Sequence, residues 1–148
     1  MPQSLARILV HIIFSTKNRQ PLIEPGVEAE LHRYLASVCR ARQSPAFTIG
    51  GMDDHVHVLC SLSKNIAVAD LLEQIKTESS KWMKRKGCRQ FYWQTGYGAF
   101  SIGESGVAAV RKYIARRKEH HRKVPFKEEL RAFLKRYRVE YDERYVWD

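Results

Sequence analysis

The stretch PAFTIGGMDDHVHVLCSL, residues 45–62, decides the fold of this chain. Apolar and β-branched residues stand on both sides of the turn GGMDD, so the sequence predicts two strands joined as a hairpin. Side chains alternate between the two faces of a strand. His55 and His57 therefore project to one face of the second strand, while Val56 and Val58 project to the other face, into a core.

The rest of the chain predicts further strands and helices around this hairpin. Their order is β-α-β-β-α-β followed by two helices, which predicts an α+β, ferredoxin-like fold: an antiparallel sheet with helices on one face, plus C-terminal helices that carry a tyrosine. Ser105 is the expected N-cap of the helix at about 106–122, which contains Tyr113 and is called the tyrosine helix below. Strands are expected at 7–16 and 98–102, and helices at 27–42, 66–86, about 106–122 and 126–137.

The composition limits the class of protein. The chain has 148 residues, of which 44% are hydrophobic, and no apolar run approaches the ~18 residues of a membrane span. We therefore expect one domain over residues 1–148, with no signal peptide or membrane partner. The three cysteines form no CxxC motif, which excludes a zinc ribbon and makes a disulfide framework improbable. A reducing cytoplasm is the expected compartment.

The positive charge is concentrated in the second part of the chain. Residues 1–60 hold six Lys or Arg against five Asp or Glu, whereas residues 61–148 hold twenty against eleven. The net charge is +10 overall, and +9 of it lies after residue 60. Such a one-sided excess is typical of proteins that bind nucleic acid, although a solubilising surface is the alternative.

The His-x-His pattern at residues 55–57 is a candidate metal site. Two imidazoles ~7 Å apart on one strand face can converge on one ion, and neutral imidazole suits a divalent metal. The pattern alone is weak, because such pairs also occur as ordinary polar positions on an exposed sheet. A third ligand has to come from elsewhere. We interpret His11 as a buried, hydrogen-bonded residue and His32 as a surface residue.

The segment 110–123 is a basic helix that contains one tyrosine. It holds seven Lys or Arg and one Glu, and helical spacing places Tyr113, Arg117 and His120 on one face. A tyrosine can attack a phosphodiester and conserve its bond energy as a covalent ester. A metal ion and arginines would stabilise the added negative charge. The alternative for Tyr113 is a half-buried aromatic that only packs.

Taken together, motifs along nearly the whole chain resemble the HUH single-tyrosine transposases of bacterial insertion sequences. The resemblance includes the relatives that act on repetitive extragenic palindromes. The motifs that carry it are HIIFSTKNRQPLI, GGMDDHVHVL, SLS, LLEQIKTESSKW, FYWQTGYGAFSI, VRKYI followed by HH, and EYDERYVWD.

This resemblance implies an activity and a set of partners. It implies a homodimer in which the histidine pair of one subunit works with the tyrosine helix of the other. It implies Mg²⁺ or Mn²⁺ bound by His55 and His57, and Tyr113 as the nucleophile. The tyrosine would form a 5′-phosphotyrosine link, free a 3′-hydroxyl, and rejoin single-stranded DNA by the reverse reaction. The expected substrates are element ends or palindromes folded as hairpins.

One position departs from the family pattern. The family usually places a glutamine four residues after the tyrosine as the third metal ligand, and here that position is Arg117. A guanidinium has no free lone pair for a metal. Our hypothesis is that His120, on the same helix face, takes this role. Water ligands or reduced metal affinity are the alternatives.

Basic and aromatic residues are candidate DNA contacts. The better candidates flank Tyr113 and are Arg111, Arg116, Arg117 and Arg122. The other candidates are phosphate contacts by Lys64, Lys76, Lys81, Lys84 and Arg85 and base stacking by Trp82. The alternative for this second group is a solvated helix face with Trp82 in the core. Gly96 and Gly98 favour a hinge before the tyrosine helix.

Three other functions compete with this one. The first is a domesticated protein that binds a DNA hairpin without cutting it, and Arg117 in place of the expected glutamine is the feature that favours it. An RNA-recognition domain shares the fold class, but TGYGAFSI lacks the basic residue of its strand signature. A metal-dependent hydrolase would need a carboxylate base, for which Asp53 and Asp54 are available.

Overall fold

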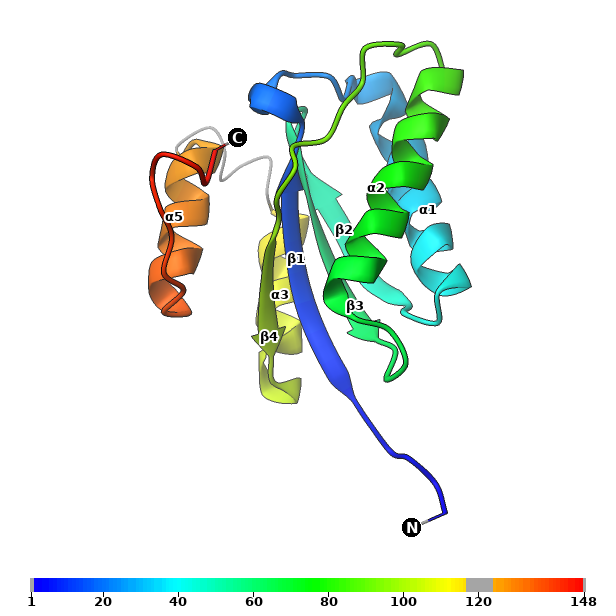
Figure 1. Ribbon diagram of the computed structural model, residues 1–148, viewed down its shortest axis with the longest axis vertical. Helices are drawn as coiled ribbons and strands as arrows, with labels where there is room; N and C mark the ends of the chain where they lie inside the picture. The colour runs from blue at the N-terminus through cyan, green and yellow to red at the C-terminus, as the bar shows by residue number, and fades with distance from the viewer. Residues whose placement is uncertain (1, 117–123, 148) are drawn as a thin grey trace.

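The computed structural model describes residues 2–116 and 124–147. Its centre is a four-stranded antiparallel sheet with the strand order β2-β3-β1-β4 (Figure 1). The strands are β1 (Ile8–Ser15), β2 (Ala46–Gly51), β3 (His55–Leu62) and β4 (Gly98–Ile102), and the α-helices are α1 (Pro25–Ala41), α2 (Val68–Arg85), α3 (Val107–Ala115) and α5 (Phe126–Arg136).

The predicted ferredoxin-like order is confirmed. The hairpin expected at residues 45–62 forms β2 and β3, and β1 lies between β3 and β4. Strand β1 is buried on both faces, as its continuous apolar sequence predicts. A layer of α1 and α2 on one face, together with additional C-terminal helices, also agrees with the expected fold.

The two faces of the sheet have separate cores. Val10, Ile12 and Phe14 of β1 pack with α1 and α2 in the larger core. Ile13 points to the other face and packs with Phe126 and other apolar residues of α5. In Figure 1, α1 and α2 lie together on one side of the sheet and α5 lies on the other. The histidine face of β3 is therefore covered by the C-terminal helices.

The start of α3 differs from the prediction. Ser105 was expected to cap this helix, but it lies within a short 3₁₀ helix, η2 (Glu104–Gly106). Gly106 occupies the N-cap position, and no side chain caps the helix there. The described part of α3 ends at Ala115, and the predicted continuation to residue 122 falls mostly outside the described residues.

Two adjacent glycines allow close packing at the end of β2. Gly51 has φ +155°, and a Cβ there would run into the backbone of His55 and Val56 on β3. A Cβ on Gly50 would lie 2.7 Å from Ile114 Cγ2 and 2.9 Å from the Ile114 carbonyl oxygen. Gly50 therefore lets α3 approach the sheet directly beside its paired residue, His57.

None of the helices within the described ranges is both long and apolar enough to cross a bilayer.

Gly50→Ala should lower the free energy of unfolding by about 1–3 kcal/mol, because the new methyl group meets a backbone carbonyl that cannot move without α3. Urea unfolding would measure this. Gly26→Ala on α1 is the matched control, because a Cβ there meets nothing within 4 Å. An equal effect of the two substitutions would contradict the close approach of α3.

Candidate active site

His55 and His57 lie on the same face of β3, as the strand alternation predicts. Both side chains are fully buried, and the neighbouring Val56 and Val58 belong to the core on the opposite face. β1 fixes their register, because Ser15 pairs with His55 and Ile13 pairs with His57. Because β3 is paired with β1 on one side and β2 on the other, the positions of the two imidazoles relative to each other are fixed.

A carboxylate from α5 joins the two histidines. Among the described residues, His55, His57 and Glu129 form a group whose ligand atoms all lie within 4.8 Å of one another. Glu129 Oε1 lies 2.9 Å from His57 Nε2 and 3.7 Å from His55 Nε2. Two imidazoles and one carboxylate are a donor set that fits a divalent metal ion.

The sequence analysis did not identify Glu129, although the sequence holds a signal for it. In α5, Phe126, Leu130 and Leu134 form the apolar stripe that packs on the sheet. Glu129 follows Phe126 by three residues and so lies on that same face. An acidic residue on the apolar face of a helix is buried only when it has a partner.

The outer nitrogens of both histidines have their own partners. His55 Nδ1 lies 2.7 Å from Asp54 Oδ1, and His57 Nδ1 lies 2.9 Å from His11 Nε2. These contacts leave each Nε2 directed toward Glu129. Partners of this kind orient the ligands of metal sites. His11 is thus a buried, hydrogen-bonded residue, as predicted. Asp54 holds the Nδ1 atom of His55, on the side of the ring away from Glu129.

Burial affects the charge of the histidine next to Glu129. Desolvation lowers the pKa of His57 well below its usual value, while the hydrogen bond to Glu129 acts in the opposite direction. The imidazole is therefore neutral at neutral pH. Only the neutral form has a lone pair for a metal ion.

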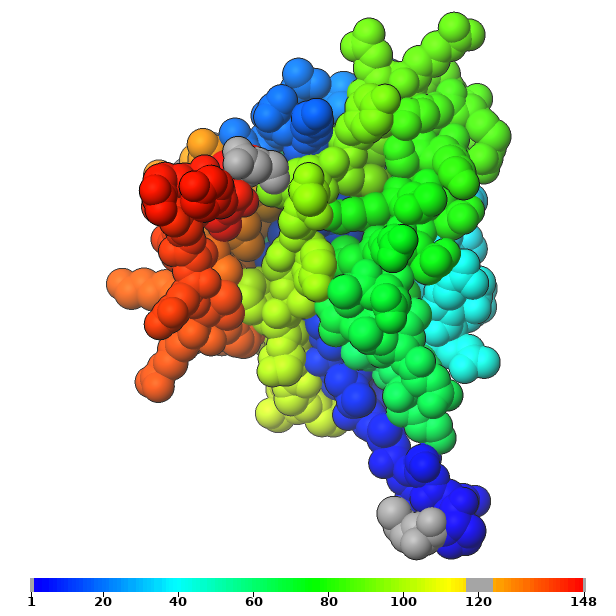
Figure 2. All heavy atoms as spheres, in the orientation of Figure 1, coloured from blue at the N-terminus to red at the C-terminus, as the bar shows by residue number. Residues whose placement is uncertain are grey.

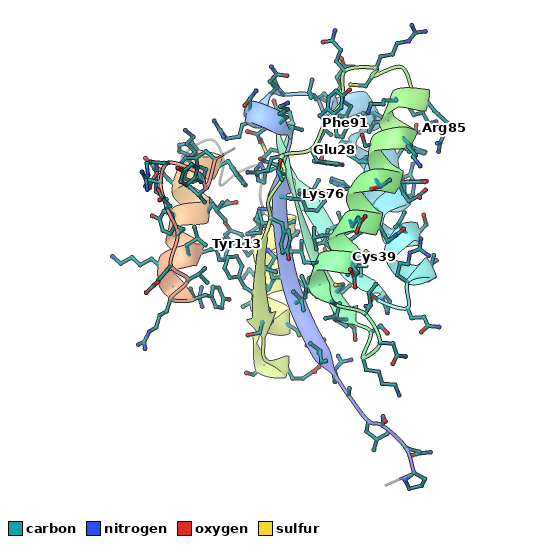
Figure 3. All side chains as sticks on the ribbon, viewed as in Figure 1. Glu28, Cys39, Lys76, Arg85, Phe91 and Tyr113 are labelled. Atoms are coloured by element: carbon teal, nitrogen blue, oxygen red, sulfur yellow. The ribbon has the colours of Figure 1, made fainter. Side chains whose placement is uncertain are left out.

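Tyr113 of α3 completes the cluster. Its hydroxyl donates a hydrogen bond of 2.6 Å to Glu129 Oε2, and its ring centroid lies 5.9 Å from that of His57. One carboxylate therefore touches both the tyrosine and the histidine pair. Figure 3 shows Tyr113 between the sheet and α5. The tyrosine and the histidine pair therefore meet within one chain.

An open cavity gives access to the tyrosine. It has a volume of about 420 Å³ and lies between β4, α3 and α5. His11, Tyr113, Phe133, Arg136 and Tyr137 are among the residues that line it. The lining of the cavity therefore combines Tyr113 with further aromatic rings and one arginine.

Three predicted site residues, Arg117, His120 and Arg122, fall outside the described residues, so His120 as the third ligand stays a prediction. Arg111 and Arg116 are exposed on or next to α3, close in sequence to Tyr113.

The candidate DNA contacts of α2 lie away from the histidine pair. Trp82 stacks on Tyr34 of α1, with ring centroids 5.2 Å apart, and is partly buried against the larger core. Lys81 is exposed. Lys76 Nζ donates hydrogen bonds to the carbonyl oxygens of Gln94, Thr95 and Gly96. Lys76 is therefore engaged within the protein.

The hinge expected at Gly96 and Gly98 stays a prediction, and the two glycines have different surroundings. Gly98 is the first residue of β4, and a Cβ there would lie 3.2 Å from the Phe100 ring and 3.3 Å from Leu130. The carbonyl of Gly96 accepts a hydrogen bond from Lys76 at 2.6 Å. Gly98 thus serves close packing.

The sequence and the fold match known proteins. A family model described as "Transposase IS200 like" matches residues 4–117. The ISDra2 transposase TnpA of Deinococcus radiodurans is 26% identical in an alignment of 111 positions, and the match covers 70% of this chain and 79% of that protein.

Two solved structures share the fold. The first, a protein of Deinococcus radiodurans R1 assigned as a transposase, has a TM-score of 0.64 at 19% identity, over 76% of this chain and 92% of that one. The second is a REP-associated tyrosine transposase bound to a REP hairpin. It has a TM-score of 0.62 at 15% identity, over 82% of this chain and 73% of that one.

Acid should destabilise the metal-free protein through His57. The pKa of His57 in the folded state lies below the unfolded value of about 6.5. Below pH 6.5 the unfolded state therefore binds more protons than the folded state. The stability present above pH 6.5 is then lost, by roughly 1 kcal/mol at pH 5.5. Urea unfolding at several pH values would measure this. His57→Asn should show a smaller dependence, and an identical dependence would contradict the assignment.

Proposed function

The chain belongs to the IS200-like transposase family, a family of DNA transposases, and on that premise we propose that it cuts and rejoins single-stranded DNA with Tyr113 as the nucleophile. One observation carries the proposal. The Tyr113 hydroxyl lies 2.6 Å from a carboxylate that also contacts the histidine pair. A nucleophile, a proton acceptor and a metal-binding group are therefore adjacent.

The chemistry follows from these neighbours. The phenol proton of Tyr113 passes to Glu129 Oε2, and the phenolate oxygen bonds to the scissile phosphorus. The bond from phosphorus to the 3′-oxygen breaks, and that oxygen leaves as a 3′-hydroxyl after taking a proton from water. The 5′ end remains attached to Tyr113 as a phosphotyrosine. Reversal with another 3′-hydroxyl rejoins the strand.

His55, His57 and Glu129 would hold the metal ion. Imidazole and carboxylate together suit Mn²⁺ better than Mg²⁺, which prefers oxygen ligands. The bound ion would polarise the scissile phosphate and stabilise its added negative charge. Asp54 and His11 would keep the two imidazoles in orientation by holding their Nδ1 atoms.

DNA hairpins are the proposed substrate class. The support is the family and the structurally similar REP-associated transposase, which is bound to a REP hairpin. The net charge of +10 suits a polyanionic partner. Asp54, one of the two aspartates available as the base of a metal-dependent hydrolase, is hydrogen bonded to the outer side of His55.

We expect a covalent protein–DNA adduct that depends on Tyr113. Labelled hairpin DNA with single-stranded flanks would be mixed with the protein and Mn²⁺ and resolved on a denaturing protein gel. Tyr113→Phe should abolish the adduct, because phenylalanine has no oxygen to attack, while the exposed Tyr145→Phe should leave it unchanged. Hairpin binding by the wild-type protein without any adduct would instead indicate a domesticated binding protein.

Mixing two inactive variants tests which chain supplies each group. Tyr113→Phe mixed with His57→Ala should remain inactive, because Tyr113 meets the histidine pair of its own chain. Recovery of the adduct in the mixture would support active sites shared within a homodimer, as the family resemblance implied.

Glu129→Ala should weaken Mn²⁺ binding more than about tenfold, because this substitution removes a candidate metal ligand. Loss of a residue that only hydrogen bonds to a metal ligand already lowers metal affinity by about tenfold or more. Isothermal titration calorimetry would measure the affinity. Glu128→Ala is the matched control, because Glu128 is the exposed neighbour on α5. If His120→Ala weakened binding and Glu129→Ala did not, the third ligand would be His120.

A further inference from the structure

A groove lies between α2 and the segment that precedes β4, apart from the histidine cluster. Its volume is about 540 Å³. In Figure 2, α2 (green) and this segment (yellow-green) lie next to each other on the face toward the viewer. Figure 3 places Lys76 on the α2 side of the sheet and Tyr113 on the side of α5. The residues that matter here are Lys76, Lys81, Lys84, Tyr92, Trp93 and Tyr97.

The helix wall of the groove is basic. Among the described residues that line the groove, the charged ones are three lysines and one glutamate, Glu73. Lys81 and Lys84 are three residues apart on α2, so both face the same side of the helix. Because Lys76 is occupied by carbonyl oxygens, Lys81 and Lys84 are the cations that can bind an anion here.

The opposite wall presents aromatic rings to solvent. Tyr92 is 54% exposed and Tyr97 is 43% exposed. The ammonium of Lys84 lies 4.2 Å from the centroid of the Tyr92 ring. A cation and an aromatic face are therefore paired at one end of the groove.

Trp93 and the backbone that follows it are held in place within the protein. Trp93 packs edge-on against Phe14 and Phe91, with centroid distances of 4.7 Å to each, and its indole nitrogen donates to Ser79 Oγ. Lys76 Nζ holds the next part of the segment through three carbonyl oxygens at 2.6–3.2 Å. A preordered surface loses less entropy when it binds a ligand.

We propose that this groove binds the single-stranded flank of the DNA substrate, with phosphates on Lys81 and Lys84 and bases stacked on Tyr92 and Tyr97. The inference rests on the proposed function for the identity of the substrate. Exposed rings beside lysines match single strands, whose bases are free to stack, whereas a duplex hides its base faces.

The position of Tyr97 connects the groove to the active-site side. Tyr97 lines the groove and also lines a small cavity with Gly98, Leu130 and Val146. Leu130 is next to Glu129 on α5. A strand that leaves the groove over Tyr97 therefore passes toward the helix that carries the carboxylate of the cluster.

Fluorescence anisotropy with labelled oligothymidylate, in the presence of EDTA, tests the groove without catalysis. The Tyr92→Ala/Tyr97→Ala protein should bind about tenfold more weakly or worse, from the usual size of base stacking. The Tyr92→Phe/Tyr97→Phe protein keeps both rings and should bind like the wild type. Lys81→Ala and Lys84→Ala should each reduce the salt dependence by about 0.7 in log–log slope.

Controls separate the groove from general effects. Tyr145→Ala and Arg40→Ala remove an exposed ring and an exposed charge elsewhere, and should leave affinity unchanged. Thermal melting would confirm that each variant is folded. A blunt hairpin without flanks should bind the wild type and the alanine pair equally.

The outcomes distinguish the groove from the proposed reaction. If the wild type forms the covalent adduct but the alanine pair binds oligothymidylate as tightly as the wild type, the groove assignment is overturned and the reaction stands. If oligothymidylate binding depends on Tyr92 and Tyr97 while no adduct forms, the groove is supported and the proposed reaction fails.

Discussion

The buried carboxylate of Glu129 is the constraint on which the site depends. A carboxylate removed from water is unfavourable by several kcal/mol unless its oxygens are paired. Here one oxygen contacts His57 and the other accepts a hydrogen bond from Tyr113. The carboxylate therefore requires β3, α3 and α5 to meet in one register. Gly50, which gives α3 its close approach to β2, serves the same requirement.

The fold could be predicted because its information is local. The alternation around His55 and His57, and the helical spacing of apolar residues, each depend on neighbours a few positions away. These patterns located the four strands and the helices in the right order. The expected cap at Ser105 was wrong because the chain inserts a 3₁₀ turn before α3, which no side-chain pattern of the sequence specified.

The site was harder to predict because its contacts are distant in sequence. Glu129 follows His57 by 72 positions, and its role depends on how α5 docks on the sheet. The position of Glu129 on the apolar stripe of α5 indicates that the carboxylate has a buried partner. The sequence does not identify that partner. Likewise, Lys76 was predicted from charge alone as a DNA contact, and only the structure reveals the three carbonyl oxygens around its ammonium.

The sheet separates two apolar clusters of unequal size. The larger holds α1 and α2, while the smaller holds α5 through Ile13, Phe100, Phe126, Leu130 and Leu134. Regions with fewer buried contacts open more often than the rest of a protein. Amide hydrogens of α5 should thus exchange with solvent through a partial opening that leaves β1 and α2 protected. Such an opening would separate Glu129 from the histidines and dismantle the active site while the sheet persists.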